Sequence, residues 1–220
     1  MTDLRSLPVT AELVGYAVDH GSWPVDEVLA DLRDETRALG SPAGMQIGAD
    51  QGQLLTLLTR VAGAGRAVEV GTFTGYSSIC IARGLADDGR LLCCDVSEEW
   101  TALARRAWGR AGLADRIELR LAPALETLRA LPTDELIDLV FIDADKPGYV
   151  AYWDELVPRV RPGGLLLADN VLWGGRITNE PGDDANLGAL RAFNDHVAAD
   201  ARVEAVVLPA FDGLTIARKR

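Results

Sequence analysis

Two apolar segments of this 220-residue chain each end in side chains that could hold a cation. Asp143 directly follows one segment, and Asp169 and Asn170 follow the next one. Adjacent parallel strands lie about 4.8 Å apart, so the tips of two such strands can converge on one ion. Carboxylate and amide oxygens are hard donors that suit Mg²⁺, Mn²⁺ or Ca²⁺ rather than zinc. The pattern predicts a divalent-cation site; the structural alternative is that Asp145 and Asp169 only cap helices or turns.

A second group of residues surrounds the glycine-containing turn at residues 71–75. Glycines let a backbone approach a ligand closely, and the start of the following helix offers free N–H groups to an anion. Asp95 ends the next apolar segment, at about the 20-residue spacing at which an acid bonds ribose hydroxyls in nucleotide-binding folds. The turn and Asp95 together predict an adenosine-containing ligand. The turn lacks the G-x-G-x-x-G spacing, which argues against a nicotinamide or flavin cofactor, and glycines alone could form a purely structural turn.

The hydrophobic pattern predicts the elements that position these residues. The first third indicates helices at 10–18 and 25–39, and a third helix with Asp50 as its N-cap. From residue 66 onward short strands alternate with helices. Strands are expected at 67–70, 90–95, 116–121, 136–142, 164–168, 203–208 and 214–217, and helices at 75–85, 98–111, 123–130, 149–160 and 186–199. This alternation predicts an α/β fold with a doubly wound parallel sheet, helices on both faces and an antiparallel end.

Composition excludes several other classes of protein. The net charge is −11, with 48% hydrophobic and 25% charged residues, as in a soluble globular protein. The acidic balance argues against nucleic acid as a partner. No apolar stretch reaches the ~18–20 residues that a membrane span needs, and the N-terminus does not resemble a signal peptide, so we expect a cytoplasmic protein without a membrane partner. Cys80, Cys93 and Cys94 are expected to be buried structural thiols.

Four segments of the chain resemble the cation-dependent class I S-adenosylmethionine O-methyltransferases, namely VEVGTFTGYSSICIARGL, CCDVSEEW, FIDADKPGY and ADNVLWGGR. That family includes caffeoyl-coenzyme A and catechol O-methyltransferases. The resemblance extends from about Met45 to Arg220. It implies a Rossmann-like, seven-stranded, mostly parallel sheet with one antiparallel strand. It also implies a single methyltransferase domain over 1–220, with a helical N-terminal cap region at 1–62 and a cofactor-binding and catalytic core at 63–220.

The resemblance implies S-adenosylmethionine as cofactor and places it against a defined set of residues. These are Met45, Glu69, Gly71, Tyr76, Ser77, Asp95, Ala124 and Asp143. Within the set, Glu69 and the Gly71 backbone hold the methionine end, Asp95 takes the ribose hydroxyls and Met45 covers the methyl group. The turn at 122–124 reads adenine, with alanine at position 122 where the family usually has glycine.

The resemblance also implies how the acceptor is held. Asp143, Asp169 and Asn170 match the family's metal ligands, with Mg²⁺ as the expected ion and Mn²⁺ or Ca²⁺ as alternatives. Lys146 matches the catalytic lysine, a general base for the hydroxyl that receives the methyl group. The acceptor, a catechol-type (vicinal dihydroxy aromatic) small molecule, would contact Lys146, Asn170 and Trp173. The family further suggests a homodimer.

Two other functions compete with this interpretation. One is a nucleotide-dependent oxidoreductase on a related sheet, which the missing third glycine disfavours. The other is a non-catalytic S-adenosylmethionine-binding protein, which the intact lysine and the three expected ligands disfavour. Neither the exact acceptor nor the regiochemistry of methylation follows from the sequence.

Overall fold

The computed structural model describes residues 9–21, 23–132, 136–179, 182 and 184–220. Within these residues, seven strands form one sheet in the order β3-β2-β1-β4-β5-β7-β6, and β7 runs antiparallel to both of its neighbours. The strands are β1 (Arg66–Val70), β2 (Arg90–Asp95), β3 (Ile117–Leu121), β4 (Ile137–Ile142), β5 (Val160–Ala168), β6 (Val203–Leu208) and β7 (Leu214–Lys219). The mostly parallel sheet with one antiparallel strand confirms the predicted fold class.

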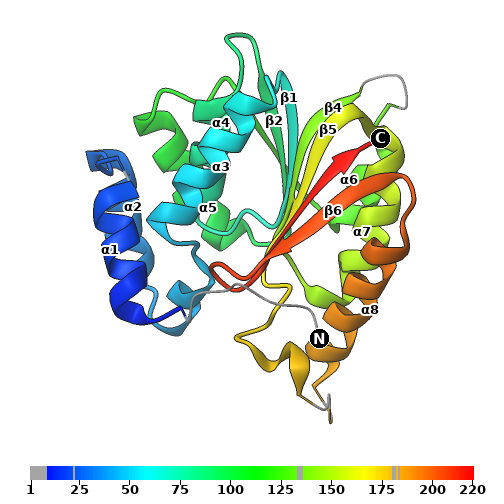
Figure 1. The fold of residues 1–220 in the computed structure, drawn as a ribbon. Helices are drawn as coiled ribbons and strands as arrows, with labels where there is room; N and C mark the ends of the chain where they lie inside the picture. The colour runs from blue at the N-terminus through cyan, green and yellow to red at the C-terminus, as the bar shows by residue number, and fades with distance from the viewer. Residues whose placement is uncertain (1–8, 22, 133–135, 180–181, 183) are drawn as a thin grey trace.

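Helices cover both faces of this sheet, with α2 to α5 on one side and α6 to α8 on the other (Figure 1). The helices are α1 (Ala11–Gly21), α2 (Glu27–Arg37), α3 (Ala49–Val61), α4 (Tyr76–Gly84), α5 (Glu98–Arg110), α6 (Ala124–Ala130), α7 (Tyr149–Leu156) and α8 (Ala185–Ala199). Short 3-10 turns lie at Ser41–Met45, Lys146–Gly148, Val157–Arg159 and Arg176–Thr178. None of the described helices is both long and apolar enough to cross a membrane.

The two helix layers explain why the central strands are apolar throughout rather than alternating. In β4, Leu139 and Phe141 pack into the core under α2 to α5, whereas Val140 and Ile142 pack into the core under α6 to α8. All four side chains are fully buried. A parallel strand that is covered on both faces needs apolar residues at every position. The three cysteines are buried and free, as expected.

The sheet ladder continues one step beyond the strands and thereby aligns the polar residues at their tips. The amide of Gly71 donates to Cys94 O, that of Asp143 to Val70 O, and that of Asp169 to Ile142 O, over 2.8–3.0 Å. Each first residue after a strand is therefore held beside the tip of the neighbouring strand, and these residues meet at one edge of the sheet.

The start of α3, the end of the helix predicted at 149–160 and the start of β5 differ from the prediction. Asp50 is not the N-cap of α3, because the helix begins at Ala49 after Gly48, and Asp50 lies in its first turn. A carboxylate there still favours the positive end of the helix dipole. The helix predicted at 149–160 ends at Leu156, and β5 begins four residues earlier than predicted, at Val160. Pro158 lies between them, and proline disfavours helical continuation.

Candidate active site

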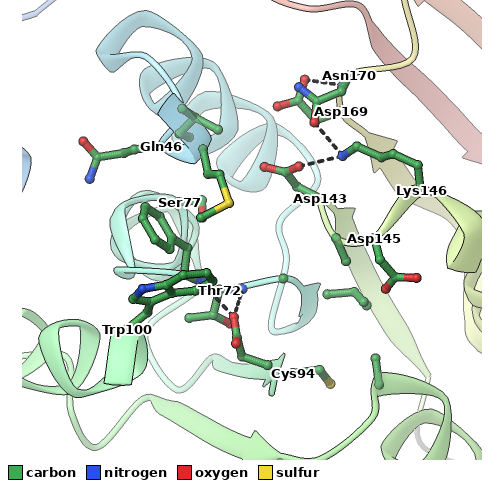
Figure 2. Close-up of a pocket in the computed structure, with 18 of the residues that line it drawn as sticks. Gln46, Thr72, Ser77, Cys94, Trp100, Asp143, Asp145, Lys146, Asp169 and Asn170 are labelled. Atoms are coloured by element: carbon green, nitrogen blue, oxygen red, sulfur yellow. Dashed lines mark hydrogen bonds and ion pairs between the residues drawn. The ribbon is translucent and has the colours of Figure 1, made fainter. Parts of the chain in front are cut away.

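A cavity of about 950 Å³ opens at the carboxyl ends of β1, β2, β4 and β5 (Figure 2). Its size lies within the range of small-molecule sites. The predicted residues on its wall are Met45, Gly71, Tyr76, Ser77, Asp95, Ala124, Asp143, Lys146, Asp169, Asn170 and Trp173. The structure thus brings together every predicted site residue except Glu69, from both the cofactor group and the acceptor group.

The loop after β1 forms the floor of the cavity and requires glycine at position 71. Gly71 has a φ of +90°, and a Cβ atom there would lie 1.9 Å from the carbonyl oxygen of Asp143. The loop therefore runs directly against the tip of β4, and a side chain at Gly71 cannot be accommodated.

Asp95 holds the same loop from the neighbouring strand. Its Oδ2 accepts hydrogen bonds from the backbone amides of Thr72 and Phe73, at 2.9 and 2.8 Å, and its Oδ1 accepts one from the Ser97 amide at 2.8 Å. A carboxylate has about four lone-pair sites, so it can accept these bonds and still receive another donor from the cavity. Asp95 shapes the loop and also faces the cavity.

Glu69 is the predicted cofactor contact that does not line the cavity. Its side chain is fully buried, and its Oε2 accepts a hydrogen bond from Cys93 Sγ at 3.2 Å. Burial raises the pKa of Glu69 to about 8. Its Oε1 has no hydrogen-bond partner, and neither does the buried hydroxyl of Thr72 on the cavity wall. Sequence reasoning placed Glu69 correctly at the loop but did not anticipate that it lies beneath the wall.

Two aromatic side chains that were not predicted lie on the cavity wall near the glycine-containing loop. Phe73 and Trp100 pack edge to face, with ring centroids 5.1 Å apart. Trp100 is in the first turn of α5, one turn beyond the tip of β2. Met45 lies on the cavity wall with 48% of its surface exposed. These apolar groups provide a surface on which a flat ring system could stack.

The residues predicted to hold the acceptor centre on Lys146, whose amine lies between residues from two strand tips. Its Nζ is 3.2 Å from Asp143 Oδ1 and 2.6 Å from Asn170 Oδ1, and Figure 2 shows the amine between these side chains. Lys146 itself is only 7% exposed. Oxygens from the β4 and β5 tips, which were predicted to hold a cation, therefore both lie against the Lys146 amine.

The carboxylates of Asp143 and Asp169 near Lys146 both have raised pKa values. Burial raises the pKa of Asp143 despite the nearby Lys146 ammonium. Burial, and then the Asp143 carboxylate, raise the pKa of Asp169 to about 6. No three His, Cys, Asp or Glu side chains among the described residues are grouped to hold a metal ion, so a metal site here depends on the Asn170 amide as a third ligand. This donor set of two carboxylates and one amide fits a hard divalent cation.

Tyr149 fixes Lys146 from below and was not predicted. Its hydroxyl accepts from Lys146 Nζ at 2.7 Å and lies 3.1 Å from the carbonyl oxygen of Asp169, to which it donates. The Tyr149 side chain is fully buried, and burial raises its pKa well above the usual value. Its position three residues after Lys146, at the start of α7, is a signal that could have identified it.

Trp173 lies on the cavity wall as predicted, in the loop after β5. It has a φ of +49°, and its indole N–H donates to Asp184 Oδ2 at 3.2 Å. The Arg176 guanidinium lies 5.3 Å from the Trp173 ring centroid. Asp212, in the turn between β6 and β7, also lines the cavity, and sequence reasoning did not identify it. Trp173 is thus held in place by Asp184 and Arg176, which do not line the cavity.

Comparisons with known proteins show which sequences and folds this chain resembles. A family model described as O-methyltransferase matches residues 19–220. A probable caffeoyl-CoA O-methyltransferase 2 of Dictyostelium discoideum is 37% identical over 94% of this chain and 91% of its own length. An O-methyltransferase from Bacillus cereus, solved with SAH, is 33% identical with a TM-score of 0.86, covering 94% of this chain and 96% of its own. The O-methyltransferase TomG from Streptomyces achromogenes, solved with SAM, is 32% identical with a TM-score of 0.86 and the same coverage.

Proposed function

This chain belongs to the O-methyltransferase family and is an S-adenosylmethionine-dependent enzyme, and from that premise we propose which reaction it performs. It transfers the methyl group of S-adenosylmethionine to one hydroxyl of a catechol-type small molecule. A divalent cation, Mg²⁺ first among the candidates, and the general base Lys146 act at the acceptor. We also propose that it works as a homodimer and as a single methyltransferase domain, in which residues 1–62 cap the core at 63–220.

The observation that carries this proposal is the convergence at Lys146. Oxygens of Asp143 and Asn170 lie within 3.2 Å of its Nζ, and all three groups face the cavity that the glycine loop closes from below. A site that only bound a nucleotide would have no use for a buried lysine among two strand-tip ligands. A base, a proposed cation site and a cofactor loop in one cavity would together support methyl transfer to a hydroxyl that is bound beside the cation.

The residues of the loop fit S-adenosylmethionine, which supplies an already activated methyl group when bound. The Gly71 backbone permits close approach, and Asp95 presents a carboxylate to the ribose hydroxyls. The unpartnered hydroxyl of Thr72 lines the cavity at the same loop, where the methionine amino and carboxylate groups need partners, and Glu69 would act from beneath this loop. Phe73, Trp100 and Met45 provide the apolar surface for the remainder of the molecule.

The acceptor residues fit a catechol. Asp143, Asp169 and Asn170 would hold the divalent cation, which favours the ionised form of a bound hydroxyl and orients vicinal oxygens. A phenolic hydroxyl has a pKa near 10 and is mostly protonated at neutral pH. In its neutral amine form, Lys146 would take the proton of the hydroxyl that receives the methyl group and become an ammonium that donates to Asp143 and Asn170. Trp173 bounds the ring of the acceptor.

Positioning makes the larger contribution to the rate. Holding two reactants in line can lower a barrier by ~7–11 kcal/mol, whereas general-base help is typically 10²–10⁴-fold, or about 3–5 kcal/mol. Tyr149 and Asn170 fix the amine of Lys146, and Trp173 confines the acceptor against it. The side chains of the cavity therefore act mainly by orientation and by excluding water.

Mass spectrometry of the products of an acceptor panel tests this function. The purified chain is incubated with S-adenosylmethionine and matched pairs of vicinal diols and monophenols, with and without a chelator. We expect a mass gain of one methyl group on the diols alone, and its loss when the chelator is present. Methylation of monophenols with equal efficiency would contradict the catechol assignment, and a chain that binds S-adenosylmethionine but methylates no diol would contradict catalysis.

A further inference from the structure

Gln51 makes a long-range contact with the acceptor cluster that the proposed reaction does not yet use. It lies in α3, 118 residues before Asp169, and its Nε2 donates to Asp169 Oδ2 at 2.8 Å. Gln51 is only 3% exposed and lines the cavity. The N-terminal cap thus reaches directly into the proposed cation site through one neutral amide.

The position of this amide is set by close packing between α3 and α4. A Cβ atom at Gly52 would lie 2.8 Å from Cys80 Sγ and 2.9 Å from the Tyr76 ring, so the helices touch at the residue next to Gln51. The Thr56 hydroxyl also donates to Cys80 O at 2.8 Å, one turn farther along α3. Two tight contacts therefore hold the backbone of α3 against α4. They fix the backbone position from which the Gln51 side chain extends to Asp169.

Both oxygens of the Asp169 carboxylate are fixed by single hydrogen bonds. Oδ2 accepts from Gln51, and Oδ1 accepts from the Asn170 backbone amide at 2.7 Å. Each carboxylate oxygen has two lone pairs, so each keeps one that can face a cation. An amide donor orients the carboxylate without adding a positive charge that would compete with a cation, in contrast to the Lys146 ammonium at Asp143.

We propose that Gln51 is a positioning residue of the cation site, which holds the Asp169 carboxylate in the orientation that binds the divalent ion. This inference rests on the proposed function, because it assumes that Asp169 is a ligand. Loss of a hydrogen bond to a metal ligand from outside the coordination shell typically weakens metal binding by 10–100-fold. The effect is confined to the cation, since Gln51 makes no bond to the cofactor loop among the contacts of the described residues.

The test measures Mn²⁺ binding by electron paramagnetic resonance of the wild-type chain and of Gln51→Met, which keeps the length of the side chain and removes the donor. We expect the Kd for Mn²⁺ to rise about 10–100-fold, while the Kd for S-adenosylmethionine, from calorimetry, stays within about twofold. Saturating Mg²⁺ should restore the kcat of the variant. The matched control is Gln53→Met on the same helix, where the glutamine bonds the Trp23 carbonyl instead, and its Mn²⁺ affinity should equal that of the wild type.

A second variant and the wild-type chain distinguish a failure of the Gln51 role from a failure of the proposed cation site. Gln51→Asn keeps an amide, but its shorter side chain cannot reach Asp169. This variant should therefore weaken Mn²⁺ binding as Gln51→Met does. It serves as the test if the methionine variant does not fold. Mn²⁺ binding as tight as wild type in either folded variant would overturn the role of Gln51 and leave the proposed function standing. A wild-type chain that binds no Mn²⁺ would overturn the cation site of the proposed function, and this inference with it.

Discussion

The amine of Lys146 lies 2.6 Å from the amide oxygen of Asn170, although the two residues follow different strands and are 24 positions apart. Lys146 comes after β4 and Asn170 after β5, and these strands are parallel neighbours. Their contact joins the two strand tips, so that the proposed base and a proposed metal ligand share a hydrogen bond. Replacing either residue should therefore alter the acceptor side and leave the cofactor side intact.

Replacing Lys146 with methionine should lower kcat by about 10²–10⁴-fold, the usual contribution of a general base. Because Lys146 bonds Asp143, Tyr149 and Asn170 rather than the glycine loop, the Kd for S-adenosylmethionine should change by less than about twofold. Steady-state kinetics and calorimetry measure the two quantities. The other lysine of the chain, Lys219 in β7, offers a matched control, since Lys219→Met should leave kcat unchanged. An equal loss of turnover and cofactor binding in Lys146→Met would mean that the lysine is structural.

Asp95→Ala should weaken S-adenosylmethionine binding by about tenfold or more, since a hydrogen bond to a charged group is worth about 1.5–3 kcal/mol. The change removes the proposed ribose contact and also frees the backbone amides of Thr72 and Phe73. Both effects should lower the affinity for S-adenosylmethionine. Calorimetric titration checks the affinity, with the exposed Asp115→Ala as control. An unchanged dissociation constant would remove Asp95 from the cofactor site.

Gly71→Ala should abolish cofactor binding and destabilise the fold. The new Cβ would lie 1.9 Å from the Asp143 carbonyl oxygen, at a φ of +90° that alanine rarely adopts. Thermal unfolding and calorimetry measure the two effects. Gly188→Ala is the matched control, because this glycine lies in α8 with nothing within 4 Å of its Cβ position, and the change should stabilise by roughly 0.5–1 kcal/mol. Wild-type affinity in Gly71→Ala would show that the loop does not approach the ligand closely.

Glu69 should make the stability of the protein fall as pH rises. Burial raises its pKa to about 8 from 4.5, so the folded state holds a proton that the unfolded state has lost between these pH values. Stability is therefore lost progressively from about pH 4.5 to pH 8. The loss is on the order of a few kcal/mol, since each pKa unit corresponds to about 1.4 kcal/mol.

Glu69→Gln removes this titration and tests it directly. Urea unfolding of the ligand-free chain at pH 5 and pH 9 should show that the variant gains stability relative to wild type at the higher pH. Glu12→Gln in the exposed helix α1 should show no such gain. A difference between Glu69→Gln and wild type that does not depend on pH would contradict the buried, protonated state of Glu69.

The parts of the site that were predictable are those encoded locally. Asp143 and Asp169 each follow an apolar strand directly, Asn170 comes next, and parallel strands bring their tips to one edge of a sheet. The order of elements was predictable for the same reason, because alternating short strands and amphipathic helices leave few other arrangements. Asp95 belongs to this group, since its place at the end of β2 follows from the pattern alone.

The parts that were not predictable depend on contacts between distant segments. Gln51 meets Asp169 only because α3 packs closely on α4, and no local pattern encodes that distance. Glu69 has the expected residue type and place, but the depth at which a strand side chain is buried depends on the helices that cover it. The end of α7 before Pro158 and the start of β5 at Val160 were missed because the apolar periodicity favoured one continuous helix to residue 160.

The central claim, that two strand tips hold a hard cation beside the methyl donor, is tested most directly by methyl transfer to a vicinal diol as a function of free Mg²⁺. After exhaustive chelation the wild-type chain should lose transfer to the level of background and regain it when Mg²⁺ is added. Asp169→Asn should need a much higher Mg²⁺ concentration for half-maximal activity, because it removes one of the two carboxylate ligands. Full activity of the chelated wild-type chain would contradict the account.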